Sequence, residues 1–208
     1  MFYSIAHFLR DKMPWLWNIV DILNSYLFII RYGSKLNAVE QQVFNKYSKD
    51  FKIMRFREVD TDKLVEFFAH QPEEAYTFFK PHGFDAKSIK KLQRNKAFLA
   101  YILLDVSDGF NGLQEFSSNI IAGYCFNRSF FHGKGFRGRM VGIDYRSRGL
   151  GTMLNKLLNE VGFGIGLRLF ETVSKDNVAS YRSALSASNV KVIEEIKHNE
   201  LYLEILPE

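Results

Sequence analysis

The chain has 208 residues, of which 47% are hydrophobic and 20 are Phe, and this is enough apolar material for one packed domain with an appendage. Its net charge of +5 suits an anionic ligand, but it is too small to indicate nucleic-acid binding, and no nucleic-acid motif occurs. The single cysteine, Cys125, excludes an internal disulfide and is consistent with a reducing compartment.

The N-terminal part of the chain predicts helices. A short amphipathic helix comes first, and Pro14 opens a second one, because proline is tolerated in the first turn. Gly33 is expected to end that second helix, and the polar stretch after it is typical of a further helix or a linker. We therefore expect a boundary near Asp50, between a helical appendage (1–50) and a second domain (51–208).

The second helix is apolar nearly all round. Its run from Trp15 to Ile30 is too short for a membrane span and contains polar residues. Three of them form one narrow stripe at helical spacing: Asn18, Asp21 and Ser25. Such a helix is buried or lies at an interface, and we favour packing against protein. A homodimer contact and a membrane-surface contact through residues 1–50 are the alternatives.

The rest of the chain predicts alternating strands and helices. Periodicity and turn residues place strands over 51–59, 97–105, 119–131, 136–143, 167–173, 191–196 and 200–206. Helices are expected after the cap Asp60 and over 86–94, 151–163 and 178–186. The polar stretch 107–118 predicts a hairpin loop.

The stretch 141–152 joins a strand to a helix through a basic turn. A helix N-terminus offers unpaired N–H groups and partial positive charge, which together favour an anion. Gly149 and Gly151 let the backbone approach a phosphate closely, and Arg146 and Arg148 add two cations. The turn lacks the Lys-Ser/Thr ending of a nucleotide-triphosphate loop and the three-glycine spacing of a dinucleotide fold.

This junction resembles the pyrophosphate loop of the GNAT superfamily of N-acetyltransferases, whose pattern is Arg/Gln-x-x-Gly-x-Gly/Ala after a strand. Arg146, Gly149 and Gly151 occupy the defining positions, whereas the family usually has Pro at Ile143 and often Gly at Ser147. The predicted order of elements is also that of a GNAT domain. The resemblance implies an α+β fold, with a mixed, mostly antiparallel sheet flanked by helices that splays before the turn.

The resemblance also implies acetyl-CoA as co-substrate. The turn would bind its pyrophosphate, and the end of the preceding strand would hold the pantetheine arm and stabilise an oxyanion. The residues expected to bind acetyl-CoA are Val141, Gly142, Ile143, Arg146, Ser147, Arg148, Gly149, Leu150, Gly151, Thr152 and Asn177. No cluster of metal ligands is present, so no metal is expected.

The usual acid of this superfamily is a Tyr in the later helix, within a pattern like Asn-x-x-Ser…Tyr. Asn177 and Ser180 fit the start of the pattern, but the Tyr position falls on Ala184. Tyr181 lies three residues earlier on nearly the same helical face, and it is either a substitute acid or a packing residue.

An acceptor amine has to lose a proton, so a general base is also sought. The candidates are His82, His132, Glu171 and Asp144. His82 is favoured because the flanking Pro and Gly fix a turn that should overhang the acceptor side. Glu171 is expected beside the split in the sheet, whereas Asp144 is expected to support the turn. Cys125 is expected to be a core residue.

The sequence thus favours a cytoplasmic N-acetyltransferase. It would move an acetyl group from acetyl-CoA to a primary amine of a small molecule, with an amino sugar as a candidate, by direct transfer in a ternary complex. The aromatic segment 76–84 would line the acceptor side. Two alternatives remain open. One is a non-catalytic acyl-CoA-binding or regulatory domain, favoured by Ala184, and the other is a peripheral membrane or scaffold protein acting through residues 1–50.

Overall fold

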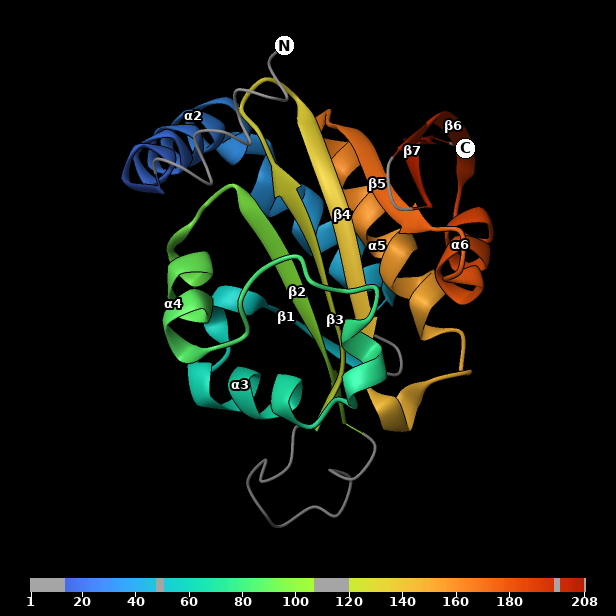
Figure 1. The fold of residues 1–208 in the computed structure, drawn as a ribbon. Coiled ribbons are helices and arrows are strands. Elements are labelled where there is room, and N and C mark those ends of the chain that lie inside the picture. Colours follow the sequence, from blue (N-terminus) through green and yellow to red (C-terminus); the bar gives the residue numbers. More distant parts are fainter. Residues whose placement is uncertain (1–13, 48–50, 107–119, 197–198, 208) are drawn as a thin grey trace.

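A seven-stranded sheet in the order β1-β2-β3-β4-β5-β7-β6 is the centre of the computed structural model, which describes residues 14–47, 51–106, 120–196 and 199–207 (Figure 1). The strands are β1 (Phe51–Arg55), β2 (Phe98–Asp105), β3 (Ile120–Ser129), β4 (Lys134–Val141), β5 (Arg168–Ser174), β6 (Asn189–Ile196) and β7 (Glu200–Leu206). β4 and β5 pair in parallel, and the other described neighbours pair antiparallel. The expected mixed, mostly antiparallel sheet is confirmed.

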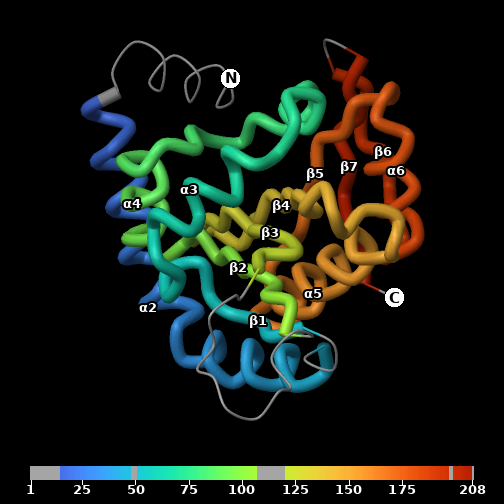
Figure 2. The backbone as a smooth tube through the Cα atoms, turned by 90° about the horizontal axis from the view of Figure 1, so that it is seen from below, coloured from blue at the N-terminus to red at the C-terminus, as the bar shows by residue number. Residues whose placement is uncertain are grey.

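Helices cover both faces of the sheet (Figure 2). They are α2 (Pro14–Tyr47), α3 (Thr61–Ala69), α4 (Ala86–Arg94), α5 (Leu150–Ile165) and α6 (Val178–Leu185), with short 3₁₀ turns η1 (Phe56–Glu58), η2 (Glu73–Tyr76) and η4 (Ile143–Tyr145). α3 and α4 pack on one face, and α2 and α5 pack on the other. The interior strand β2, between β1 and β3, is buried on both faces, which explains its unbroken apolar run.

α2 continues through Gly33, so the prediction that this glycine ends the helix is wrong. A glycine ends a helix by adopting a left-handed conformation, and Gly33 does not adopt one. Packing on the sheet outweighs the low helix propensity of glycine, because side chains on both sides of Gly33 are buried: Phe28, Tyr32, Leu36 and Val43. The division near Asp50 stays a prediction, since residues 48–50 lie outside the described residues.

β1 and β4 both end earlier than predicted. β1 ends at Arg55, and η1 then turns Phe56 and Val59 into the core beneath α3 and α4. β4 ends at Val141, so Ile143 belongs to a 3₁₀ turn and not to the strand. The predicted N-terminal amphipathic helix and the hairpin loop 107–118 lie outside the described residues. No described helix is long and apolar enough to cross a membrane.

α5 lies unusually close to β5 at Gly162. A Cβ added to this glycine would lie 2.7 and 2.9 Å from the two methyl groups of Leu169, which is fully buried. We therefore expect Gly162→Ala to lower the free energy of unfolding by about 1–3 kcal/mol, because overpacking outweighs the better helix propensity of alanine. Urea unfolding would measure this, and Lys156→Ala, at an exposed position of the same helix, should change little.

Candidate functional site

The turn between β4 and α5 leaves several backbone donors free. Ser147 and Gly149 both adopt left-handed conformations, with φ of 62° and 78°, and the first bonds of α5 go to the carbonyl of Gly149. Within the described part of the chain, the N–H groups of residues 147–151 donate no hydrogen bond to protein atoms. Residues 146–149 are exposed, so the unpaired donors among them are available to an anion.

Two arginines place positive charge at the same turn. Arg146 is exposed beside the free donors. The guanidinium of Arg148 lies 5.2 Å from the ring centroid of Tyr145, whose hydroxyl donates to Asp105 Oδ2 at 2.8 Å. This ring is buried, so it gives Arg148 a fixed support. The turn therefore combines two cations with unpaired backbone donors, and its binding of a phosphate stays a prediction.

One edge of β4 is open next to this turn. The N–H of Gly142 donates to the carbonyl of Ala122 in β3, and backbone groups alternate in direction along a strand. Even-numbered residues of β4 thus turn toward β3, and odd-numbered residues turn toward β5. Pairing with β5 ends at Phe136 and Phe170. Beyond that point, the outward backbone N–H and C=O groups of Arg139 and Val141 have no strand partner among the described residues.

Gly142 and Ile143 were expected to hold the pantetheine arm through their backbone, but their N–H groups already donate hydrogen bonds within the protein. Gly142 is bonded to β3, and the N–H of Ile143 donates to Oε1 of Gln71 at 3.0 Å. Gln71 is buried, and its own amide donates to the carbonyl of Phe67. Of the three residues that were expected to hold the pantetheine arm, Val141 is therefore the one that turns toward the open edge. Gln71 was missed, because it lies 72 residues away in the sequence.

Glu171 joins two arginines across the point where β4 and β5 separate. Arg137 Nε donates to Glu171 Oε2 at 2.6 Å, and Arg139 Nη1 donates to Oε1 at 2.9 Å. Burial alone would raise the pKa of Glu171, but the charges of Arg139 and Arg137 outweigh it, and the pKa lies below its ordinary value. A carboxylate held in this state is a weak proton acceptor.

Arg139 also connects this ion pair to α6. Its Nη2 donates to the carbonyl and to Oγ of Ser180, at 2.8 and 3.1 Å. Asn177 caps α6 by accepting from the N–H of Ser180, as expected. A Cβ added to Gly151 would lie 3.1 Å from Ser183 Oγ, so the first turn of α5 touches α6 as well. The structure thus brings Asn177, Glu171 and the turn between β4 and α5 together around the open edge of β4.

His82 lies over the opposite face of the sheet. Its Nδ1 is 2.8 Å from the carbonyl of Gly83, which requires Nδ1 to carry the proton, and its Nε2 then accepts from the hydroxyl of Tyr124 at 2.8 Å. Burial lowers the pKa of His82 to about 4, the bond to Gly83 opposes this, and Arg128 adds to it. Its ring packs against Phe68, Phe84, Phe98, Tyr124 and Phe126. Both nitrogens of the neutral imidazole are therefore in use.

The other candidates are dispersed. His132 precedes β4 at the end away from the turn between β4 and α5, roughly 24 Å along the strand. Asp144 is exposed and lies 3.6 Å from His70, where it was expected to support the turn. Tyr181 is half-buried against the core beside α5, and Ala184 is fully buried. Cys125 is a core residue as expected, and burial raises the pKa of its thiol.

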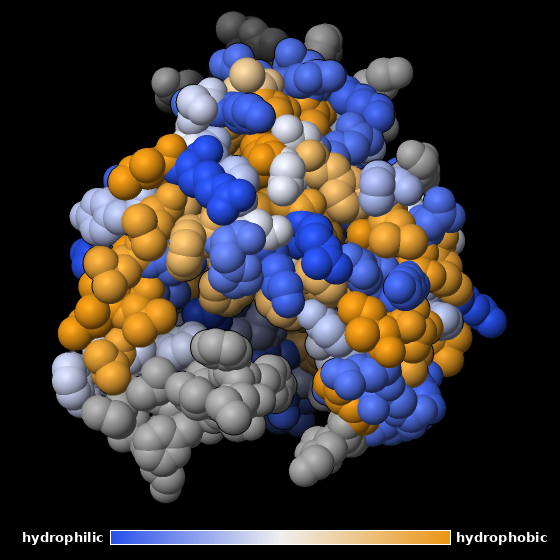
Figure 3. All heavy atoms as spheres, turned by 90° about the horizontal axis from the view of Figure 1, so that it is seen from above, coloured by the Kyte–Doolittle hydropathy of each residue, from blue (hydrophilic) through white to orange (hydrophobic). Residues whose placement is uncertain are grey.

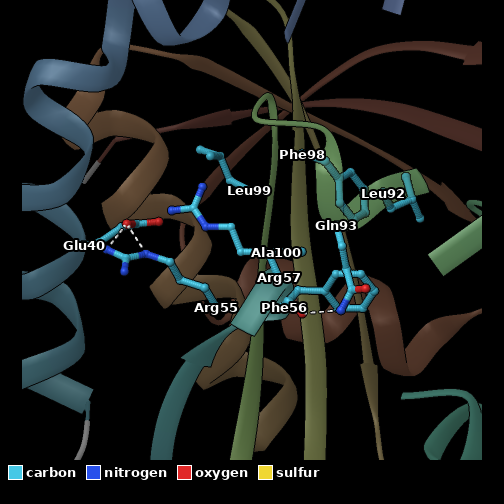
Figure 4. Close-up of a pocket in the computed structure, with 9 residues that line it drawn as sticks. All are labelled: Glu40, Arg55, Phe56, Arg57, Leu92, Gln93, Phe98, Leu99 and Ala100. Atoms are coloured by element: carbon cyan, nitrogen blue, oxygen red, sulfur yellow. Dashed lines mark hydrogen bonds and ion pairs between the residues drawn. The ribbon is translucent and has the colours of Figure 1, made fainter. Parts of the chain in front are cut away.

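One hollow lies on the face of the sheet that α3 and α4 cover, and another lies near α2. An open apolar hollow of about 310 Å³ is lined by Val65, Phe68, Ala69, Tyr76 and Phe84. A second cavity, of about 20 Å³, lies beside the partly buried ion pair of Glu40 and Arg55 (Figure 4). That is room for about one water molecule, so the second cavity is too small for a substrate. No group of His, Cys, Asp and Glu side chains among the described residues could hold a metal ion.

Solved structures share this architecture. The GNAT domain of S. lividans PAT superposes with a TM-score of 0.60 at 12% identity, over 74% of this chain and 89% of that one. The chain has the GNAT fold. A GNAT-family acetyltransferase from Bacillus anthracis gives 0.56 at 15% identity, over 76% and 95% of the two chains. The aminoglycoside acetyltransferase AAC(6')-Ib, in complex with coenzyme A and kanamycin, gives 0.51 at 11% identity, over 74% and 93%. No protein-family model and no curated protein matches the sequence.

Proposed function

We propose that the protein is an acetyl-CoA-dependent N-acetyltransferase. The observation that carries the proposal is the cationic turn with free N–H groups at residues 147–151, directly beside the open edge of β4, within a GNAT fold. These residues fit the two parts of coenzyme A that need polar partners. A diphosphate suits the donors and the arginines of the turn, and an amide-bearing arm suits an unpaired strand edge.

Each group of the site then has a defined task. The turn, with Arg146 and Arg148, holds the pyrophosphate, and Val141 with its odd-numbered neighbours binds the arm. Acetyl-CoA supplies a thioester, whose carbonyl carbon a neutral amine attacks. The new C–N bond replaces the C–S bond, and CoA leaves as a thiolate that takes up the proton lost by the amine. A backbone N–H of the open edge stabilises the negative charge that develops on that carbonyl oxygen. Holding the two reactants together accounts for much of the rate, as in other direct transfers.

The acceptor we propose is a primary amine of a small molecule, with an amino sugar as the first class to test. Aminoglycoside and spermidine acetyltransferases are among the proteins that share the fold. The segment 76–84 lies over β3 and β4 on the side opposite α5, where an acceptor would meet the end of the arm. His82 and Tyr181 remain the proposed proton-transfer residues, and a cytoplasmic location remains a prediction.

A non-catalytic acyl-CoA-binding domain is the second candidate function. Three observations favour it. Ala184 is fully buried at the expected Tyr position, Glu171 is committed to two arginines, and both nitrogens of His82 are bonded. Such a protein would bind acetyl-CoA through the same turn and release no thiol in the presence of amines.

The test begins with calorimetric titration of acetyl-CoA into the full chain. We expect Arg146→Ala/Arg148→Ala to weaken binding by about 10- to 100-fold, because two charge-assisted contacts to phosphate are lost. Arg57→Ala removes an equally exposed cation far from the turn and should leave binding unchanged. If Arg146→Ala/Arg148→Ala and Arg57→Ala bound acetyl-CoA with equal affinity, the proposed phosphate site would be refuted.

A thiol-release assay then separates the two candidate functions. Amino sugars, polyamines and peptides are offered with acetyl-CoA at saturating concentration. Release that depends on an amine supports the transferase and identifies the acceptor class. Tight binding without release from any of these amines supports the acyl-CoA-binding domain instead.

A further inference from the structure

The first half of α2 is amphipathic, but its polar side faces the protein and its apolar side faces outward, which is the reverse of an ordinary surface helix. Its polar stripe faces the protein, where each polar side chain binds a turn or a neighbouring helix. Asn24 accepts from the N–H of Phe131 at 2.9 Å and donates to the carbonyl of Ser129 at 3.0 Å. Ser25 accepts from the N–H of Lys96 at 2.8 Å. The polar residues of the helix are thus used to hold it onto the ends of β2 and β3.

The outward side of the same half-helix is apolar. The exposed side chains are Trp15 (61%), Ile19 (45%), Val20 (41%), Ile22 (56%), Leu23 (55%), Tyr26 (57%), Leu27 (44%) and Ile30 (78%). At 100° per residue they occupy one continuous arc of roughly 160°. We call these eight residues the apolar face of α2. Figure 3 shows hydrophobic residues gathered along the left side of the molecule, where α2 lies.

A contiguous apolar face of this size indicates an interaction surface. It does not serve the fold, because the contacts that hold α2 in place are made by the opposite side of the helix. Phe131, which is 43% exposed and bonded to Asn24, adds to it from the turn between β3 and β4.

The border of the apolar face is basic. α4 lies beside the apolar face, as the hydrogen bond from Lys91 to Asn18 Oδ1 shows. α4 contains no acidic residue, and its four cations are all exposed: Lys87, Lys90, Lys91 and Arg94. Lys96 lies 5.1 Å from the ring centroid of Tyr26, and Arg31 follows the face along the helix. Asp21 is the one acid within residues 14–36, and it is turned inward to Asn95.

We propose that the apolar face of α2 docks on a membrane surface that contains anionic lipids. The charge pattern distinguishes a membrane surface from a second copy of the chain as the partner of this face. Two copies meeting through this same face would bring two α4 helices, each with four cations, toward one another, which is unfavourable. An anionic bilayer surface instead attracts the basic border while it accepts the apolar side chains.

The geometry suits a helix that lies in the plane of the interface. Residues 15–30 span about 24 Å, and an interfacial helix inserts its apolar side about 5–10 Å. Trp15 and Tyr26 are the residue types that prefer this depth. The globular domain would then stand on the membrane through the edge formed by α2 and α4. This proposal is independent of the acetyl-transfer chemistry proposed above.

Vesicle flotation of the full chain tests the proposal, with vesicles of phosphatidylcholine alone and of equimolar phosphatidylcholine and phosphatidylserine. We expect binding to the anionic vesicles that weakens as salt increases. Lys90→Gln/Arg94→Gln should lower that affinity by about fivefold for each removed cation. Lys156→Gln/Lys191→Gln makes the same change in net charge at exposed positions elsewhere and should leave the affinity unchanged.

A second pair of variants tests the apolar face. Ile22→Gln/Leu23→Gln/Ile30→Gln should lower binding by at least about tenfold, since each residue inserts its side chain into the bilayer. Leu185→Gln/Val192→Gln/Ile193→Gln alters three similarly exposed residues on α6 and β6 and should bind like the original chain.

Three results would overturn the proposal. One is no binding of the full chain to the anionic vesicles. Another is binding that neither the α4 variant nor the α2 variant weakens. The third is a dimer in sedimentation velocity without lipid that the α2 variant converts to a monomer, because a second copy would then cover the face. The α4 variant changes only exposed side chains, so it decides the question even if the α2 variant does not fold.

Discussion

Glu171→Ala is expected to lower the free energy of unfolding by about 3–5 kcal/mol, which is the usual cost of breaking a buried ion pair from one side. The side chain of Arg137 is fully buried and that of Arg139 is 7% exposed, so neither guanidinium can turn to solvent when the carboxylate is lost. One Arg137 nitrogen, Nη2, already has no hydrogen-bond partner among the described residues. Removing Glu171 would leave two buried cations facing each other across the end of the β4–β5 pairing.

Urea unfolding at neutral pH measures this effect. The matched control is Glu195→Ala, which removes a carboxylate from an exposed pair with Lys175, whose side chains are 57% and 40% exposed. Exposed pairs contribute at most about 1 kcal/mol, so the control should unfold almost like the original chain. A loss at Glu171 as small as that at Glu195 would show that the two arginines are solvated in the native state, contrary to the structure.

The position of Glu171 was only partly predictable from the sequence. Alternation along β5 places Glu171 on the same face as Leu169 and Val173, and both of these are core residues. A charged residue on such a face needs a buried partner of opposite sign. Arg137 and Arg139 alternate in the same way along β4, so the ion pair had a detectable pattern. What the sequence does not contain is the register that aligns the two strands.

The shape of the turn between β4 and α5 was predictable because it depends on local chain geometry. Arg146, Gly149 and the strand and helix around them are close in sequence, and the structure reproduces them. The end of α2 was not predictable in this way, because the buried residues on both sides of Gly33 contact α5 and the sheet, which lie far away in the sequence. The local propensity of glycine favoured a helix end at Gly33, but tertiary packing outweighed it and the helix continues.

Gln71 and the surroundings of His82 illustrate the same limit. Both depend on contacts between α3, the segment 76–84 and the sheet, and these contacts join residues 42 to 72 positions apart. The sequence shows aromatic residues on both sides of His82 but not that they enclose the imidazole. It therefore suggested a base that overhangs the acceptor side, where the structure shows a half-buried neutral ring that bonds the segment to Tyr124.

This enclosed imidazole makes the stability of the protein sensitive to mild acid. In the unfolded chain His82 binds a proton near pH 6.5, whereas in the native protein it stays neutral until the pH reaches about 4. The unfolded state thus binds more protons in this window, and the free energy of unfolding falls as the pH is lowered from 6.5 toward 4. A pKa difference of about 2.5 corresponds to about 3 kcal/mol in total, and about 2 kcal/mol is expected between pH 7 and pH 5.

Comparison with His82→Gln isolates this contribution. Glutamine offers a donor and an acceptor for the contacts with Gly83 and Tyr124, but it does not titrate in this range. The variant should be less stable at pH 7, because the packing of the ring is lost, yet its stability should change by about 2 kcal/mol less than that of the original chain between pH 7 and pH 5. Urea unfolding at the two pH values gives the difference. Carboxylates and His132 titrate in both proteins and cancel, so parallel losses in the two proteins would mean that His82 is protonated in the native state. An imidazolium cannot accept from the hydroxyl of Tyr124, so such a result would mean that Nε2 donates to the Tyr124 oxygen instead.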